Sequence, residues 1–173
     1  LGYSFGSGVT IPGTGVLMNN QMNNFAYSYG DKEERGRSAS FGNKFEPGKK
    51  PMSTMAPVMV FNKKNELSLI TGSPGGSLIP AAILRVITGV IDFDLNIGEA
   101  TMLTRVHKDW PALGIRYENT LTPIVVKRLK EMGHGARSDK TMGSTQSIHI
   151  IDGVNHGYSD LRRPGAGVSI QPN

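Results

Sequence analysis

The sequence of 173 residues contains no cysteine, which excludes a disulfide scaffold, a cysteine nucleophile, thiolate-bound zinc and iron–sulfur clusters. Its purely apolar runs fall far short of the roughly 18 residues that cross a bilayer, so we expect no membrane span. Glycine (22) and proline (10) together stay below the share of about 25–30% that indicates low complexity. The length and a hydrophobic content of 38% suffice for a folded core.

Charge is unevenly distributed along the chain. The first 30 residues contain no acidic, basic or histidine side chain, which predicts short buried or site-lining strands broken by glycines. Residues 31–50 are charged, glycine-rich and aperiodic, and we expect an exposed, mobile loop there. The net charge is +5, but basic and acidic residues are interleaved and no pattern of stacking aromatics accompanies them. These features indicate a solvated surface and no nucleic-acid partner.

Regular elements are expected from residue 57 onward. Residues 58–61 and 67–71 are short apolar runs that predict a hairpin. A mostly buried helix is expected over about 78–91, because its apolar residues almost encircle it. Asn96 and Glu99 have the spacing of a capping box at the start of a short helix. The remaining expected elements are an amphipathic surface helix over 122–132 and a hairpin over 147–152 and 156–159. Together they predict an α+β fold with a mostly antiparallel sheet.

Residues 72–77, GSPGGS, lie between an expected strand and an expected helix. Glycines there let the backbone approach a ligand closely, and the N–H groups at a helix N-terminus favour an anion. Gly75 and Gly76 could therefore form an oxyanion hole for acyl transfer. A simple tight turn between strand and helix explains the same residues.

Two further segments carry polar side chains that could bind a small molecule. Ser53 and Thr54 lie between Pro51 and Pro57 and could present two hydroxyl donors to a carboxylate, or simply begin a strand. Residues 19–24, NNQMNN, could be turn residues or an uncharged pocket wall. The four histidines have no spacing typical of metal ligands, so we expect no metal and no cofactor.

These segments occur in an order that resembles the small, C-terminal subunit of gamma-glutamyltransferases, which are N-terminal-nucleophile hydrolases. The matching stretches are FGSG (5–8), LMNNQMNNF (17–25), PGKKPMSTMAP (47–57), TGSPGGSLI (71–79), NIGEA (96–100), residues 105–107, MGSTQSI (142–148) and YSDLR (158–162). They cover nearly the whole chain, so residues 1–173 are assigned to part of one small-subunit domain.

The resemblance implies a four-layer αββα sandwich and a precursor that cuts itself to expose a nucleophilic threonine. It assigns the oxyanion hole to Gly75 and Gly76. It assigns the α-carboxylate of a γ-glutamyl substrate to Ser53 and Thr54, and places Gln21 and Asn24 against its α-amino group. The large subunit is the implied partner, and the periplasm or cell exterior is the implied location.

The sequence also departs from the family pattern. The threonine nucleophile opens a strand that precedes the residues matching Leu1–Gly8, so we expect the isolated chain to lack that first strand and to be inactive. Gly2 replaces a usual asparagine, and Thr54 replaces a usual serine. Asn24 stands where an aspartate is usual, and it offers a neutral dipole instead of a charge to the substrate amine.

Two alternatives follow from these departures. Asn24 suits a glutaryl-type acylase of the same family, whose substrate amides lack the α-amine. The positive charge and the missing nucleophile suit a non-catalytic binding relative. Whether the complete protein is a gamma-glutamyltransferase or a glutaryl-type acylase, the expected ligand is a small γ-glutamyl or glutaryl amide.

Overall fold

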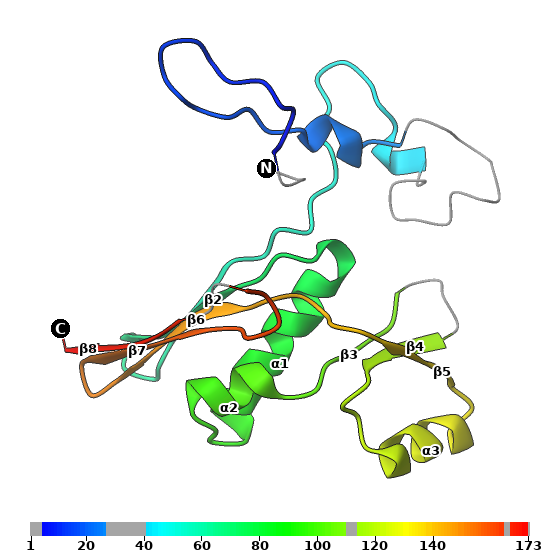
Figure 1. Cartoon of the computed structure of the whole chain (residues 1–173), viewed down its shortest axis with the longest axis vertical. Coiled ribbons are helices and arrows are strands. Elements are labelled where there is room, and N and C mark those ends of the chain that lie inside the picture. The colour runs from blue at the N-terminus through cyan, green and yellow to red at the C-terminus, as the bar shows by residue number, and fades with distance from the viewer. Residues whose placement is uncertain (1–4, 27–40, 110–113, 165–166, 173) are drawn as a thin grey trace. The chain divides into compact units, whose positions relative to one another are not determined.

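The computed structural model describes residues 5–26, 41–109, 114–164 and 167–172. It divides the chain into two compact units, Leu1–Ser53 and Thr54–Asn173. Each unit is described below by itself (Figure 1). Gly2 and residues 31–40 of the expected loop over 31–50 lie outside the described residues.

The second unit is built on a five-stranded antiparallel sheet in the order β1-β2-β6-β7-β8 (Figure 1). The strands are β1 (Val58–Phe61), β2 (Leu67–Gly72), β6 (Gln146–Ile151), β7 (Val154–Ser159) and β8 (Val168–Pro172). Both expected hairpins are therefore confirmed. The β6–β7 turn uses Asp152 and Gly153, which both have positive φ. The edge strand β8 was not predicted, because its apolar pattern is short and follows a proline- and glycine-rich stretch.

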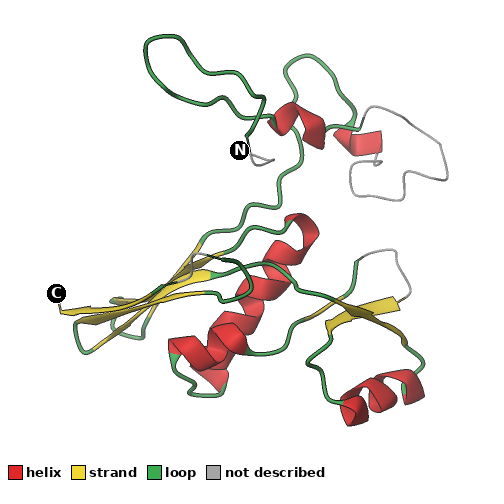
Figure 2. Ribbon diagram, viewed as in Figure 1, coloured by secondary structure: helices red, strands yellow, loops and turns green. Residues whose placement is uncertain are grey.

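Two helices cover one face of this sheet: α1 (Ile79–Asp92) and α2 (Ile97–Met102) (Figure 2). Their buried residues form one hydrophobic core with the sheet, made of Leu69, Val86, Val90, Ile97 and Ala100. The helices pack closely, because a Cβ built at Gly89 would lie 2.8 Å from the Cβ of Ala100. The helix over 78–91 is thus confirmed within one residue at each end.

The expected capping box at α2 is present. The Glu99 backbone N–H donates to Asn96 Oδ1 over 2.9 Å, and the Asn96 N–H donates to Glu99 Oε2 over 3.1 Å. These bonds satisfy two N–H groups that a helix start leaves without intrahelical acceptors.

A small second sheet in the same unit has the order β3-β4-β5. Its strands are β3 (Val106–His107), β4 (Gly114–Glu118) and β5 (Gly135–Asp139), and α3 (Pro123–Glu131) connects the last two. Strands β4 and β5 are parallel, which the expectation of a mostly antiparallel sheet did not include. α3 is the expected surface helix, but much of its apolar side is solvent-exposed in this chain: Ile124 is 65% and Met132 70% exposed.

The first unit contains the short 3-10 helices η1 (Gln21–Asn24) and η3 (Phe41–Asn43). Its described residues before η1 form turns with one isolated bridge between Thr10 and Leu17, and most are exposed. The prediction of short buried or site-lining strands over 1–30 is therefore wrong for residues 5–24, which form no strand. Glycines with positive φ break the apolar stretches before a strand can form.

Candidate active site

The segment GSPGGS joins the end of β2 to the start of α1. Gly75 has φ 137° and Gly76 has φ 57°, which L-residues with a side chain rarely adopt. Gly76 begins the 3-10 helix η4 (Gly76–Leu78), which continues directly into α1. Because the first N–H groups of a helix have no intrahelical acceptor, this place is suited to an anion. The predicted position of Gly75 and Gly76 between strand and helix is thus observed.

The loop is packed against the segment that precedes β6. Ser144 N–H donates to Ser73 Oγ over 3.0 Å, and the same hydroxyl donates to the carbonyl oxygen of Pro74 over 2.8 Å. A Cβ built at Gly75 would lie 3.3 Å from the Cα of Gly143, and one at Gly143 would lie 2.7 Å from Ser73 Oγ. Both positions therefore need glycine, and the two backbones hold each other in place.

Strand β1 brings Thr54 to the same end of the sheet. Val58 is paired with Thr71, so β1 begins beside the end of β2, where the GSPGGS segment leaves the sheet. Thr54 lies four residues before Val58 and is partly buried. The register thus places the start of β1, which the chain reaches from Thr54, at the sheet end that carries Gly75 and Gly76.

The other predicted binding residues belong to the first unit. Gln21 and Asn24 lie on η1, where Asn24 Nδ2 donates to Gln21 Oε1 over 2.7 Å. Both side chains are partly buried, whereas Ser53 is exposed at the end of the unit. The structure therefore brings Gln21 and Asn24 together. The boundary between the units falls between Ser53 and Thr54, and each residue is described with its own unit.

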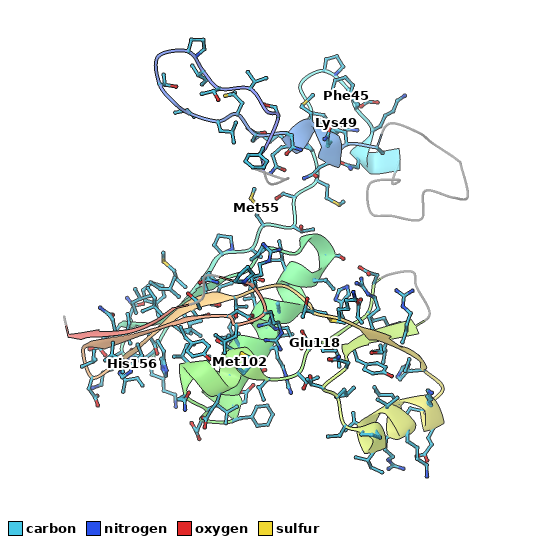
Figure 3. All side chains as sticks on the ribbon, viewed as in Figure 1. Phe45, Lys49, Met55, Met102, Glu118 and His156 are labelled. Atoms are coloured by element: carbon cyan, nitrogen blue, oxygen red, sulfur yellow. The ribbon has the colours of Figure 1, made fainter. Side chains whose placement is uncertain are left out.

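Four buried charged side chains form a network that hydrogen-bonds to the segment 142–145: Arg105, Glu118, Asp160 and Arg162. Arg105 Nη2 contacts Asp160 Oδ2 at 2.6 Å, and these side chains are 1% and 0% exposed. Arg162 donates to both oxygens of Glu118, over 2.6 and 2.7 Å (Glu118 is labelled in Figure 3). Arg162 Nη1 also lies 3.2 Å from Asp160 Oδ1, which joins the two pairs.

Both carboxyl groups of this network are held in the charged form. Burial alone would raise the pKa of Asp160 and of Glu118, but hydrogen bonds from backbone N–H groups and from the guanidinium groups outweigh that effect. The pKa of each group consequently lies below its ordinary value.

The network grips the backbone that packs against the glycine loop. Arg105 Nη1 donates to the carbonyl oxygen of Met142 over 2.6 Å, and Met142 N–H donates to Glu118 Oε1 over 2.9 Å. Thr145 N–H donates to Asp160 Oδ2 over 2.9 Å. Sequence reasoning gave these residues no role, because the partners are 15 to 37 positions apart. The available signal was Arg105 in the stretch 105–107, with Asp160 and Arg162 in the stretch 158–162.

Two of the four histidines face each other in the large sheet. His149 and His156 are partners across β6 and β7, and burial followed by the charge of His156 lowers the pKa of His149. Within the described ranges, no group of three or more histidine, aspartate or glutamate side chains is placed to bind a metal ion.

Comparison with known proteins identifies the family to which the chain belongs. The family model described as Gamma-glutamyltranspeptidase matches residues 1–170. The glutathione hydrolase proenzyme of Escherichia coli strain K12 is 37% identical over 163 residues, which cover 94% of this chain and 28% of that protein. The chain therefore belongs to the gamma-glutamyltranspeptidase family, and it spans about 28% of the length of that relative.

Solved structures agree with this assignment. The gamma-glutamyltranspeptidase of Pseudomonas nitroreducens, solved with L-DON, has a TM-score of 0.80 at 35% identity, covering 98% of this chain and 89% of that one. The cephalosporin acylase of Bacillus halodurans has a TM-score of 0.74 at 26% identity, covering 95% of this chain and 29% of that one. The predicted α+β fold of the N-terminal-nucleophile hydrolase type is confirmed by the likeness to the family. Within the described residues, this chain contributes the five-stranded sheet and the helices α1 and α2 on one of its faces. No helix in the described part of the chain is both long and apolar enough to cross a membrane.

Proposed function

We propose that this chain forms part of an autoprocessed threonine amidohydrolase and acyltransferase. The complete enzyme would cleave γ-glutamyl amides such as glutathione and pass the acyl group to water or to an amine. The observation that carries the proposal is the constrained pair Gly75 and Gly76 at the start of the helix that follows β2. Family membership over residues 1–170 supports the same chemistry.

The proposed reaction has two halves. The hydroxyl oxygen of a threonine outside this sequence attacks the γ-carbonyl carbon, and the α-amine of that threonine accepts the hydroxyl proton. The carbonyl oxygen becomes an oxyanion, which the N–H groups of Gly75 and Gly76 stabilise. Collapse breaks the amide bond, and the leaving amine takes the proton. Water or an acceptor amine then attacks the threonine ester, releasing glutamate or a new γ-glutamyl amide.

The resemblance to the family supports a proposed substrate role for four residues. Ser53 and Thr54 would donate hydroxyl hydrogen bonds to the α-carboxylate, and Gln21 with Asn24 would accept from the α-ammonium group. The large subunit of the same precursor is the proposed partner, and it would supply an arginine for the carboxylate. The periplasm or cell exterior is the proposed location, in keeping with the family.

A substitution in the glycine loop tests this function. We expect the complete, processed enzyme to release p-nitroaniline from γ-glutamyl-p-nitroanilide, faster when an acceptor dipeptide is added. Gly75→Ala should lower kcat about 10²–10³-fold, the loss typical of an impaired oxyanion hole, because its Cβ would press on Gly143. Gly153→Ala is the matched control, since that glycine also has positive φ but open space around it. Equal losses in the two variants would refute the assignment.

A second function is favoured by Asn24. A neutral amide at this place offers the substrate ammonium a dipole and not the opposite charge of an aspartate, so no ion pair can form with the substrate there. A glutaryl-type acylase, whose substrate lacks the amine, fits this site. The likeness to a cephalosporin acylase supports this alternative. Relative turnover of glutaryl- and γ-glutamyl-p-nitroanilide by the complete enzyme distinguishes the two.

A further inference from the structure

Asn43 is a buried asparagine that joins three segments of the first unit. It is 8% exposed. Its Nδ2 donates to the backbone oxygen of Asn24 over 2.5 Å, and its Oδ1 accepts from the backbone N–H of Met52 over 2.9 Å. Its own backbone oxygen accepts from the N–H of Ala26 over 3.0 Å. One residue thus uses a side-chain donor, a side-chain acceptor and a main-chain acceptor on separate parts of the chain.

The surroundings of Asn43 restrict its movement. Ala26 and Lys44 form a parallel bridge, so the two stretches around Asn43 run side by side. Phe25 is 2% exposed and meets Phe45 edge to face, with ring centroids 5.3 Å apart (Phe45 is labelled in Figure 3). This small core holds the backbone of Asn43 in place. The side-chain amide of Asn43 therefore links Asn24 and Met52 at a fixed separation.

We propose that Asn43 is a positioning residue that sets the distance between the two substrate-binding groups of the first unit. This inference rests on the function proposed above. Through its bond to Asn24, Asn43 fixes the end of η1, the helix whose side chains are proposed to bind the α-amino group of the substrate. Through Met52 it fixes the residue directly before Ser53, which is proposed to bind the α-carboxylate. Asn43 acts on substrate only through these neighbours.

An asparagine is required because the two bonds have opposite polarity. The carbonyl of Asn24 needs a donor and the N–H of Met52 needs an acceptor, and a carboxamide offers both from one planar group. Aspartate in the same place keeps the acceptor for Met52 but turns an oxygen toward the oxygen of Asn24. Asn43→Asp therefore tests the two hydrogen bonds separately. It keeps the bond to Met52, next to Ser53, and breaks the bond to Asn24.

A γ-glutamyl and a glutaryl substrate report separately on the groups proposed to bind the α-amine and the α-carboxylate. A γ-glutamyl amide presents an amine and a carboxylate, whereas a glutaryl amide presents only the carboxylate. With Asn43→Asp we expect the KM for γ-glutamyl-p-nitroanilide to rise about tenfold, the order of one to two lost hydrogen bonds. The KM for glutaryl-p-nitroanilide should change less than about twofold, and kcat should change little for either substrate. Asn43→Ala should raise both KM values.

The matched control is Asn62→Ala in the β1–β2 turn. Asn62 Oδ1 also accepts from two backbone N–H groups, those of Lys64 and Glu66, over 2.9 and 3.0 Å. It lies at the opposite end of β2 from the GSPGGS segment. Its loss removes the same kind of bond without touching a proposed binding group.

The experiment measures kcat and KM for both substrates with the complete processed enzyme and its Asn43→Asp, Asn43→Ala and Asn62→Ala variants, together with their melting temperatures. A selective KM increase for the γ-glutamyl substrate in Asn43→Asp supports the positioning role. Equal changes for both substrates, or changes matched by Asn62→Ala, overturn it while leaving the proposed function intact. A wild-type enzyme that processes neither substrate overturns the proposed function, and the positioning role with it.

Discussion

Replacing Asp160 with alanine should destabilise the protein far more than removing an ion pair of equal length at the surface. The carboxylate of Asp160 accepts hydrogen bonds from Arg105 Nη2 at 2.6 Å, from the Thr145 N–H at 2.9 Å and from the Arg162 N–H at 3.0 Å. With the carboxylate gone, the buried guanidinium of Arg105 loses its nearest counter-charge. Breaking a buried pair in this way costs about 3–5 kcal/mol of unfolding free energy.

Asp139 provides the comparison within the same chain. Arg116 donates to Asp139 Oδ2 over 2.8 and 2.6 Å, so this pair is as short as the buried one. Its side chains are each 28% exposed, and water can solvate the arginine once the aspartate is removed. Asp139→Ala should therefore cost about 1 kcal/mol or less.

Urea unfolding of the wild-type protein and of both variants, followed by circular dichroism, measures these costs. We expect Asp160→Ala to lose about 2–4 kcal/mol more than Asp139→Ala. If Asp160→Ala does not accumulate in folded form, Asp160→Asn keeps the shape and some acceptor capacity and should fall between the two. The view that the buried network determines stability would be refuted if the loss of unfolding free energy in Asp160→Ala, or in Asp160→Asn where that variant replaces it, lay within about 1 kcal/mol of the loss in Asp139→Ala.

Two further predictions follow from the site. Because the pKa values of Asp160 and Glu118 are lowered in the folded state, their stabilisation is complete above the ordinary carboxyl range of about 4 and is lost as pH falls through the folded-state values. The melting temperature should therefore fall as the pH drops below about 5, less steeply for Asp160→Asn, and a parallel decline in both proteins would contradict this cause. Asn24→Asp in the complete enzyme should raise the ratio of kcat/KM for γ-glutamyl over glutaryl amides about tenfold, as expected for a charge-assisted bond, whereas an unchanged ratio would remove Asn24 from substrate selection.

Local signals in the sequence predicted the elements whose stabilising contacts are themselves local. The capping box of Asn96 and Glu99 spans three residues, and the β6–β7 hairpin turns at Asp152 and Gly153, so short-range patterns were sufficient. The parallel pairing of β4 with β5 was not predictable in this way. It depends on a crossover through α3, and the strands carry no continuous apolar run.

The same distinction applies to the candidate site. Gln21 and Asn24 are three positions apart, and their side chains meet within one helical turn. Asn43 meets Asn24 across 19 positions and Met52 across nine, and nothing in the residues around FGNKF indicates a buried amide. The expectation of an exposed loop was therefore wrong at Asn43, because its two polar bonds and the neighbouring Phe25–Phe45 contact offset the cost of burying it.

The position of the buried charges has a physical explanation in the backbone that they hold. Ion pairs in an interior gain little net stability over apolar side chains of similar volume, so stability alone does not account for four of them together. Apolar side chains could not donate to the carbonyl of Met142 or accept from the N–H of Thr145, as Arg105 and Asp160 do. Gly143 lies between Met142 and Thr145 in the chain and packs against Gly75. The charges thus fix the surface on which the proposed oxyanion hole rests, and a change in the network should reach Gly75 through that backbone.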